Sequence, residues 1–300
     1  MPGEAMPNSD LESMARLLEE SGDYKVLRRH SKKDRYHADE GGDKKIGVFL
    51  DVETTGLVHG SDKIIELAMV PFEFTADGRI YRVLDAFNAL EDPGISIPPE
   101  IVALTGITDD DVAGQRIDDE NVERILCQTD LVIAHNAGFD RRFCERRFPS
   151  FVPKAWACSL TQIPWKQEGV ANSKLEYLAY QFGFFYQKHR AVSDCLAAIH
   201  ILAGKLPTSG QSVLKVLLDN ARKKAIRIWA LNCPFDAKDI LKSRGYTWPG
   251  DSGRVRAWYI DVDKDLFQTE LNYLFAGVFK RKVDLPTEPV NCFKRFSDRV

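Results

Sequence analysis

The chain contains 300 residues, of which 44% are hydrophobic and 28% charged, and its formal net charge is −3. This composition excludes a disordered chain, and the length suffices for about two domains of 100–200 residues. No stretch approaches the roughly 18 consecutive apolar residues of a membrane span, and the acidic N-terminus lacks the basic-then-apolar order of a signal peptide. The six cysteines form no CxxC motif, which favours reduced thiols in a cytoplasmic protein without a zinc ribbon or disulfide framework.

Composition and charge divide the chain into four segments. Residues 1–45 are expected to be a flexible N-terminal appendage, because only a short stretch has a helical hydrophobic period and the rest offers little to bury. Residues 46–206 carry a net charge of −8 and are expected to form the main domain. Residues 207–222 are expected to be a linker with a helix, and 223–300 a small basic α/β accessory domain.

Strand and helix patterns alternate within the main domain. Strands are expected over 46–50, 64–74, 79–90 and 130–134. The second and third of these runs are joined at Asp77-Gly78, which predicts a hairpin. Helices are expected over 121–127, 141–147, 174–185 and 192–202. This order predicts a mixed α/β sheet flanked by helices.

The accessory segment repeats the mixed pattern on a smaller scale. Strands are expected over 225–231 and 256–262, and helices over 235–244 and 265–279. The sequence therefore predicts an α/β main domain followed by a small α/β domain.

Two acidic residues stand where the first expected strand ends. Asp51 and Glu53 lie two positions apart, and the period of a strand places both side chains on one face. Two carboxylates this close repel each other and are unfavourable to bury unless a cation neutralises them. Oxygen ligands favour Mg²⁺ or Mn²⁺ over zinc. The alternative is a solvent-exposed Asp-x-Glu at a strand end.

Asp140, Asp194 and His189 are further candidates. Asp140 follows the strand expected over 130–134, where strand ends of one sheet can converge, although an N-cap of the next helix explains it equally well. Asp194 lies within an apolar helix, so it marks either a metal ligand or an exposed helix face. His189 precedes that helix, where it could enter a cleft and titrate near neutral pH, although a single histidine is more often structural.

Three motifs occur in a fixed order: FLDVETTGL, HNAGFD and HRAVSD. Together they resemble the DEDDh exonucleases, named for four acidic residues and a histidine, and in particular the epsilon proofreading subunits of bacterial DNA polymerase III and their stand-alone relatives. The resemblance covers residues 46–204 and includes the ALTGITDDDV segment between the first two motifs. It implies a ribonuclease H-like mixed sheet, in agreement with the expected strand order.

The resemblance also implies a role for each candidate. Asp51, Glu53 and Asp194 would hold one Mg²⁺ or Mn²⁺ ion, and Asp51 would bridge to a second ion beside Asp140. The two ions would clamp the attacking and leaving oxygens of a phosphodiester. His189 would be the general base that deprotonates the attacking water.

Two more residues match family positions that contact the terminal nucleotide. Thr54 would do so through its backbone amide and Leu57 through its apolar side chain, which could instead simply pack. The chain departs from the family at Arg190, where a small residue commonly follows the histidine. The catalytic set is otherwise complete.

The function implied is that of a metal-dependent 3′–5′ exonuclease, which hydrolyses nucleic acid with a free 3′ end to nucleoside 5′-monophosphates. Single-stranded DNA is the expected substrate, and a polymerase or repair protein is a compatible partner. An RNA exonuclease with the same chemistry and a catalytically silent nucleic-acid-binding or scaffold protein are the alternatives. No membrane association is expected. The basic and aromatic residues of 223–300 suit contacts with a single strand, although most of these aromatics can equally fill a small core.

Overall fold

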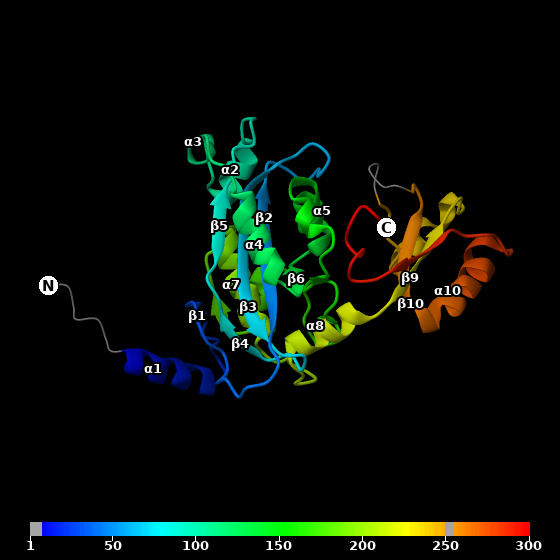
Figure 1. Cartoon of the computed structure of the whole chain (residues 1–300). Coiled ribbons are helices and arrows are strands. Elements are labelled where there is room, and N and C mark those ends of the chain that lie inside the picture. The colour runs from blue at the N-terminus through cyan, green and yellow to red at the C-terminus, as the bar shows by residue number, and fades with distance from the viewer. Residues whose placement is uncertain (1–7, 250–254) are drawn as a thin grey trace.

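The central sheet decides where the functional residues lie. The structure, a computed structural model, describes residues 8–249 and 255–300. In this part of the chain six strands form a mixed sheet in the order β4-β3-β2-β6-β7, with β5 also paired to β3 (Figure 1). The strands are β2 (Lys45–Thr54), β3 (Ile64–Phe74), β4 (Ile80–Val83), β5 (Phe87–Leu90), β6 (Leu131–Ala134) and β7 (Trp156–Cys158). Strand β2 is antiparallel to β3 and parallel to β6, so the predicted mixed sheet is confirmed.

Strand β2 is buried on both faces, and its alternation sets the direction of the acidic side chains. Val48 and Leu50 belong to one hydrophobic core, whereas Phe49 belongs to the other. Asp51 and Glu53 continue the series that begins with Phe49, so the period of two places all three on the same face of the sheet.

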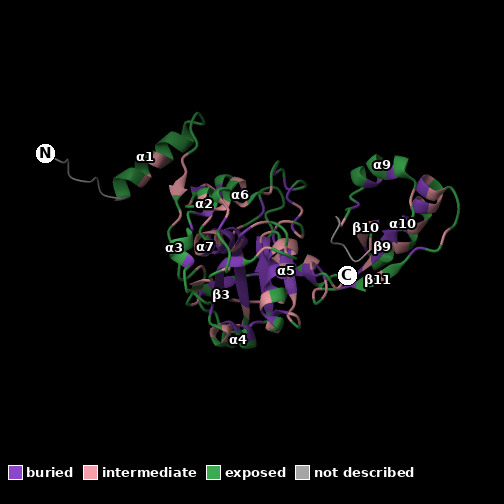
Figure 2. Ribbon diagram, turned by 90° about the horizontal axis from the view of Figure 1, so that it is seen from above, coloured by how far each residue is buried: buried purple, intermediate pink, exposed green. Residues whose placement is uncertain are grey.

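Helices cover both faces of this sheet. On the face of Val48 pack α4 (Asp119–Gln128) and α5 (Ala137–Arg147). On the face of Phe49 pack α6 (Leu175–Gln181), α7 (Ala191–Leu202) and α8 (Val213–Arg222). The short helices α2 (Pro99–Thr105) and α3 (Asp109–Val112) form a smaller core with Ile65. Buried residues concentrate in the sheet and on the inner sides of these helices (Figure 2), and none of the described helices is long and apolar enough to cross a membrane.

The predicted helices of the main domain are present, but they begin and end at other residues than predicted. Helix α5 begins at Ala137 because Asn136, with φ 80°, occupies its N-cap. Asp140 therefore lies inside the first turn, and its reading as an N-cap is wrong. Helix α6 stops at Gln181, since Gly183 adopts φ 81°, and the chain continues as β8 (Phe184–Phe185). The predicted hairpin is confirmed, with its second strand interrupted between β4 and β5.

The N-terminal segment begins with α1 (Asn8–Glu20) and then follows the main domain. Strand β1 (Arg28–Arg29) pairs in parallel with β8. The Tyr36 N–H donates to the carbonyl of Tyr81 at 2.8 Å. The stretch from Arg28 to Tyr36, predicted to be part of a flexible appendage, thus has defined partners on the domain, while residues 1–7 of that appendage lie outside the described part.

The accessory unit is a small sheet with helices. Strand β9 (Ala225–Ala230) pairs antiparallel with β10 (Trp258–Asp263) and with β11 (Thr287–Val290), which was not predicted. Helices α9 (Lys238–Ser243) and α10 (Phe267–Tyr273) pack on it. Trp229 and Tyr246 are buried in this unit, whereas Trp248 is 45% exposed. Most of its aromatics therefore fill a core, and residues 250–254 of the predicted accessory domain lie outside the described part.

The segment after β11 returns to the main domain and covers α5. The guanidinium of Arg141, which is fully buried, donates to the carbonyls of Cys292 at 3.1 Å, Phe293 at 2.6 Å and Arg295 at 2.8 Å. The Trp156 N–H also donates to Cys292. The two units are therefore joined by this return as well as by α8.

Candidate active site

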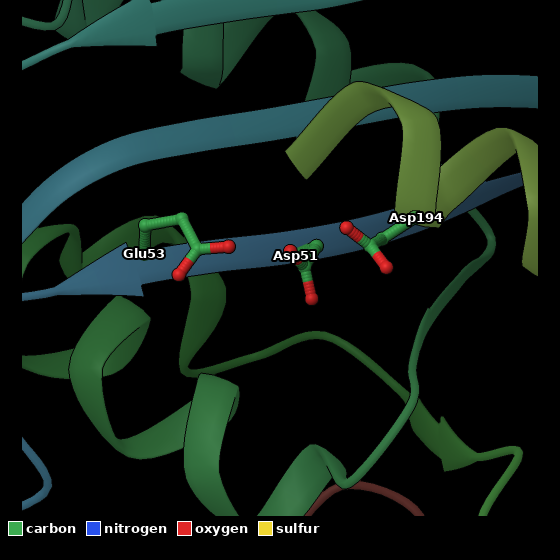
Figure 3. A group of neighbouring side chains, drawn as sticks. All are labelled: Asp51, Glu53 and Asp194. Carbon is green, nitrogen blue, oxygen red and sulfur yellow. The ribbon is translucent and has the colours of Figure 1, made fainter. Parts of the chain in front are cut away.

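Three predicted carboxylates converge at the end of β2. Asp51 and Glu53 extend from β2 and Asp194 from the first turn of α7, and their carboxylates point toward one another (Figure 3). One oxygen from each lies within 4.8 Å of the others. Asp194 is 143 positions from Asp51 and 141 from Glu53 in the sequence, and they meet here because α7 packs across β2 and β3.

Burial and mutual repulsion govern the electrostatics of this group. Burial, and then the negative charges of Asp140 and Asp194, hold the pKa of Asp51 well above its usual range. Burial raises the pKa of Glu53 to about 7, with Asp194 and Glu66 adding to the effect. The pKa of Asp194 is also raised by burial. A divalent cation would remove this repulsion, so the donor set fits a hard, oxygen-binding metal.

Asp140 approaches from the other side of β2. It lies outside the group whose oxygens fall within 4.8 Å, is 2% exposed, and accepts a hydrogen bond from the Val52 N–H at 3.3 Å. Burial raises its pKa to about 8. Of the neighbouring charges, that of Asp140 has the largest effect on the pKa of Asp51, so the two carboxylates repel each other.

His189 lies directly before α7 in an unusual backbone conformation. Its φ of 59° is left-handed, a region in which strained non-glycine residues concentrate at functional sites. The side chain is half-buried, and its charge lowers the pKa of Asp194. Within the described residues the imidazole has no hydrogen-bond partner, so both of its nitrogens are available to a water or a substrate.

Thr54 is the last residue of β2, and Leu57 lies on the turn that follows. The Thr54 hydroxyl donates to the Gly56 carbonyl at 2.6 Å, and Leu57 is 81% exposed beside the carboxylates' end of the strand. Asp62 braces the turn by accepting from the Val58 N–H at 2.7 Å. A Cβ at Gly56 would lie 2.5 Å from the Asp62 carboxylate, so only glycine allows this close approach.

Glu66, a site residue that the sequence did not predict, lies beneath the cluster. It is directly opposite Glu53 in the β2–β3 ladder and is 1% exposed. Its carboxylate accepts from the Asn88 amide at 2.9 Å and from the Ala191 N–H at 3.5 Å, and Arg190 lies 3.9 Å away. The Arg190 that departs from the family pattern therefore compensates a buried negative charge. The proximity of Glu66 to Glu53 follows only from the register of β2 and β3, which the sequence does not reveal.

Tyr186 was also missed. Its hydroxyl donates to an Asp194 oxygen at 2.8 Å, and burial raises the pKa of the phenol far above its ordinary value. The tyrosine thus stays neutral and fixes the orientation of Asp194. A tyrosine eight positions before an aspartate gives no sequence signal, because β8 and the turn at His189 bring the two side chains together.

His135 is a structural residue. Its Nε2 lies 2.9 Å from the Ser173 carbonyl and its Nδ1 2.9 Å from the Ser159 hydroxyl. Since a carbonyl can only accept, Nε2 carries the proton and Nδ1 accepts from the hydroxyl. Burial lowers the pKa of His135 to about 4, so it stays neutral and is not free to bind a metal.

Comparisons with known proteins show the family to which the chain belongs. The family model RNase_T, described as an exonuclease, matches residues 48–202. The chain is 32% identical over 161 residues to a PolC-type DNA polymerase III of Clostridium perfringens and 36% identical over 164 residues to that of Listeria welshimeri. Each match covers 52% of this chain but only 11% of the relative. Exonuclease X in complex with 5′-overhanging duplex DNA is 26% identical, with a TM-score of 0.42, over 58% of this chain and 98% of that one. The chain belongs to the RNase_T exonuclease family, and residues 48–202 are its DEDD-class 3′–5′ exonuclease domain.

Proposed function

We propose that this protein is a divalent-cation-dependent exonuclease that removes nucleoside 5′-monophosphates one at a time from the 3′ end of DNA. The observation that carries the proposal is the convergence of Asp51, Glu53 and Asp194, from two elements, with oxygens within 4.8 Å. The three residues are half-buried, whereas a cluster on the open surface would be fully exposed and would not have the pKa of Glu53 raised to about 7. A catalytically silent protein of this fold would have no reason to keep so unfavourable a cluster.

The carboxylates divide into two ligand sets. We propose that Asp51, Glu53 and Asp194 hold one Mg²⁺ or Mn²⁺ ion and that Asp51 and Asp140 hold a second. When bound, two such ions neutralise charge on the attacking and leaving oxygens of a phosphodiester. Tyr186 keeps Asp194 oriented for this task, and the Arg190–Glu66 pair supports the start of α7. We propose that Thr54 and the exposed Leu57 contact the terminal nucleotide.

DNA is the proposed substrate because the relatives named above are DNA polymerases. Their matched segment is a small part of a long polymerase, which makes a polymerase or repair protein a reasonable partner for this chain. Single-stranded 3′ ends suit a site whose carboxylates lie beside an exposed apolar side chain, since a paired terminal base would first have to be separated from its neighbour.

The decisive experiment uses matched DNA and RNA oligonucleotides, labelled at the 5′ or the 3′ end, with Mg²⁺, with Mn²⁺ and with a chelator. We expect a ladder of shortened 5′-labelled DNA, immediate release of a 3′-terminal mononucleotide, and no reaction in the chelator. Asp51→Ala and Asp194→Ala should lower turnover at least about a thousandfold, since charge neutralisation in a transition state is commonly the largest single contribution. Near-normal turnover of either variant in Mg²⁺ would contradict the ligand assignment, and faster shortening of RNA would reassign the substrate.

A second prediction concerns His189 as the general base. Activity should rise with pH as the base loses its proton, and His189→Ala should lose roughly 10²–10⁴ in rate together with that rise. Lys188→Ala is the matched control, because Lys188 is adjacent but pairs with Glu176 at 2.9 Å. If the His189 variant kept the same rising limb, the limb would belong to another group.

A further inference from the structure

The N-terminal segment closes a pocket on the flank of the exonuclease domain. The pocket has a volume of about 580 Å³ and lies between residues 25–33 and the turn from α6 into β8. Its wall on the domain side includes Phe182, Phe184 and His200, and its outer wall includes Lys25 and His30. This size is within the range of small-molecule sites. The carboxylate cluster is not part of its lining.

Positive charge exceeds negative charge in the lining of this pocket. Lys25, Arg29 and Lys33 line it, and among the described residues none of the three has a carboxylate partner. Lys25 instead lies 3.9 Å from the centre of the Tyr180 ring. The lining residue Arg28 is different, since Glu12 and Glu19 of α1 both pair with it, at 2.8 and 3.1 Å. Glu19 is the one acidic residue of the lining and is already paired with Arg28, so the excess of cations attracts an anionic ligand and opposes a metal ion.

Two histidines that line the pocket are in contact, and each has a ring nitrogen without a hydrogen-bond partner. His30 and His200 have ring centres 5.1 Å apart, and His200 also contacts the Phe184 ring at 4.9 Å. His30 Nε2 and His200 Nδ1 are buried and have no hydrogen-bond partner. Buried polar atoms without partners are rare in folded proteins, and each calls for an explanation. Burial lowers the pKa of His200 to about 4, so the ring is neutral near pH 7 and can present an N–H at that nitrogen.

We propose that this pocket binds a nucleotide, with the phosphate among Lys25, Arg29 and Lys33 and the planar base against the rings of His30, His200 and Phe184. A phosphate would neutralise the unpaired cations. A nucleobase would supply a flat surface for the aromatic rings and hydrogen-bond partners for the two imidazole nitrogens that have none. The inference goes beyond the proposed function, because binding here requires no hydrolysis. His200 follows Asp194 by six residues on α7, which places the pocket about 9 Å along the helix from the carboxylates.

The nucleotide bound in this pocket could be a free mononucleotide or one nucleotide of a bound strand. Titration calorimetry of the full chain in a chelator distinguishes them, with a 5′-mononucleotide, inorganic phosphate and a short single-stranded oligonucleotide as separate ligands. The chelator removes the cations on which catalysis depends, so the result does not depend on whether the chain is a nuclease. We expect the nucleotide, free or in the strand, to bind at least about tenfold more tightly than inorganic phosphate.

The variants test the location. Arg29→Ala with Lys33→Ala should weaken nucleotide binding at least about tenfold, and both side chains are exposed, so folding should be preserved. Lys238→Ala with Lys242→Ala, two exposed cations on α9, is the matched control and should leave binding unchanged. In NMR spectra the ring signals of His30 and His200 should shift on addition of nucleotide. Equal binding of nucleotide and inorganic phosphate, unchanged binding in the Arg29/Lys33 variant, or unmoved histidine signals would each overturn the assignment.

Discussion

At the scale of single residues, the site is a concentration of like charge that the fold holds in place. Asp51, Glu53, Asp140 and Asp194 each have a raised pKa, and burial is the largest cause for all four. Tyr186 and Arg190 relieve part of the repulsion. The remaining repulsion between the carboxylates opposes folding whenever they are ionised and no cation is bound.

The pH dependence of stability follows from these shifts. Because the folded state holds its carboxyl protons more tightly than the unfolded chain, the contribution of these groups to stability falls as pH rises from about 4 to about 8. In a chelator the melting temperature should therefore be several degrees lower at pH 8 than at pH 5, and millimolar Mn²⁺ should restore it at pH 8 but scarcely change it at pH 5. Differential scanning fluorimetry measures both effects.

Asp51→Asn provides the control for this prediction. Removing one ionisable group from the cluster should flatten the pH dependence and raise the melting temperature in a chelator at pH 8. Equal melting temperatures for the two proteins under that condition would show that the cluster is not a source of instability.

Some of these site residues could be predicted from the sequence and others could not, for a physical reason. Asp51 and Glu53 share a face because side chains alternate along any strand, so their spacing alone predicts their proximity. Glu66 contributes through its register opposite Glu53, and a sequence does not reveal which residues of two strands are paired. Arg190 departs from the family pattern in the sequence, and its pairing with the buried Glu66 is visible only in the structure.

At the scale of elements, the turn between β2 and β3 is built to hold Leu57 in solvent. Asp62 is the brace of this turn, since its carboxylate accepts from the Val58 N–H and lies 3.5 Å from the Thr55 hydroxyl. An exposed leucine held by a fixed backbone can contact a nucleotide without first losing conformational freedom.

Loss of that brace should affect binding more than chemistry. Asp62→Ala should raise KM about tenfold or more and leave kcat nearly unchanged, since a hydrogen bond to a charged group contributes about 1.5–3 kcal/mol and about 1.4 kcal/mol corresponds to a factor of ten. Asp77→Ala is the control, because Asp77 also braces a turn, accepting from Arg79 at 3.0 Å, but lies on the hairpin away from the site. Steady-state kinetics on a short oligonucleotide measure the split, and a fall in kcat alone would show that the turn acts in the chemical step.

Elements with strong periodicity were predicted, and those that depend on distant partners were not. The strands 64–74 and 130–134 and the helix over 192–202 have long apolar patterns. Strands β1 and β8 are short, and each exists only because the other is paired to it. The N-terminal segment therefore gave no local signal of its position.

At the scale of the whole molecule, Arg141 connects the two units. Its guanidinium is fully buried in the exonuclease domain, and most of its acceptors are carbonyls of the segment that follows β11. Helix α8 also packs in the core of that domain, so we propose that the domain extends through Arg222 and that the accessory unit begins at β9. A buried cation without acceptors is strongly unfavourable.

Deletion of residues 291–300 should lower the melting temperature by on the order of 10 °C, because breaking a buried ionic arrangement costs about 3–5 kcal/mol. Arg141→Met in the shortened chain should recover part of the loss, since the side chain then needs no acceptors. Arg142→Met, which removes an ion pair of 3.1 Å with Asp298 that is accessible to solvent, should have little effect in the full chain. A shortened chain with an unchanged melting temperature would refute the role of Arg141.

The same connection constrains the order in which the protein is completed during synthesis. Arg141 and its acceptors Cys292 and Arg295 are separated by 151 and 154 residues. At a translation rate of about 5–20 residues per second, roughly 8–30 s pass between the synthesis of α5 and that of its covering segment. Over this interval Arg141 has its partner Glu145 on the same helix but lacks its three carbonyl acceptors. We therefore expect the helix that carries Asp140 to pack fully only after the segment following β11 has been synthesised.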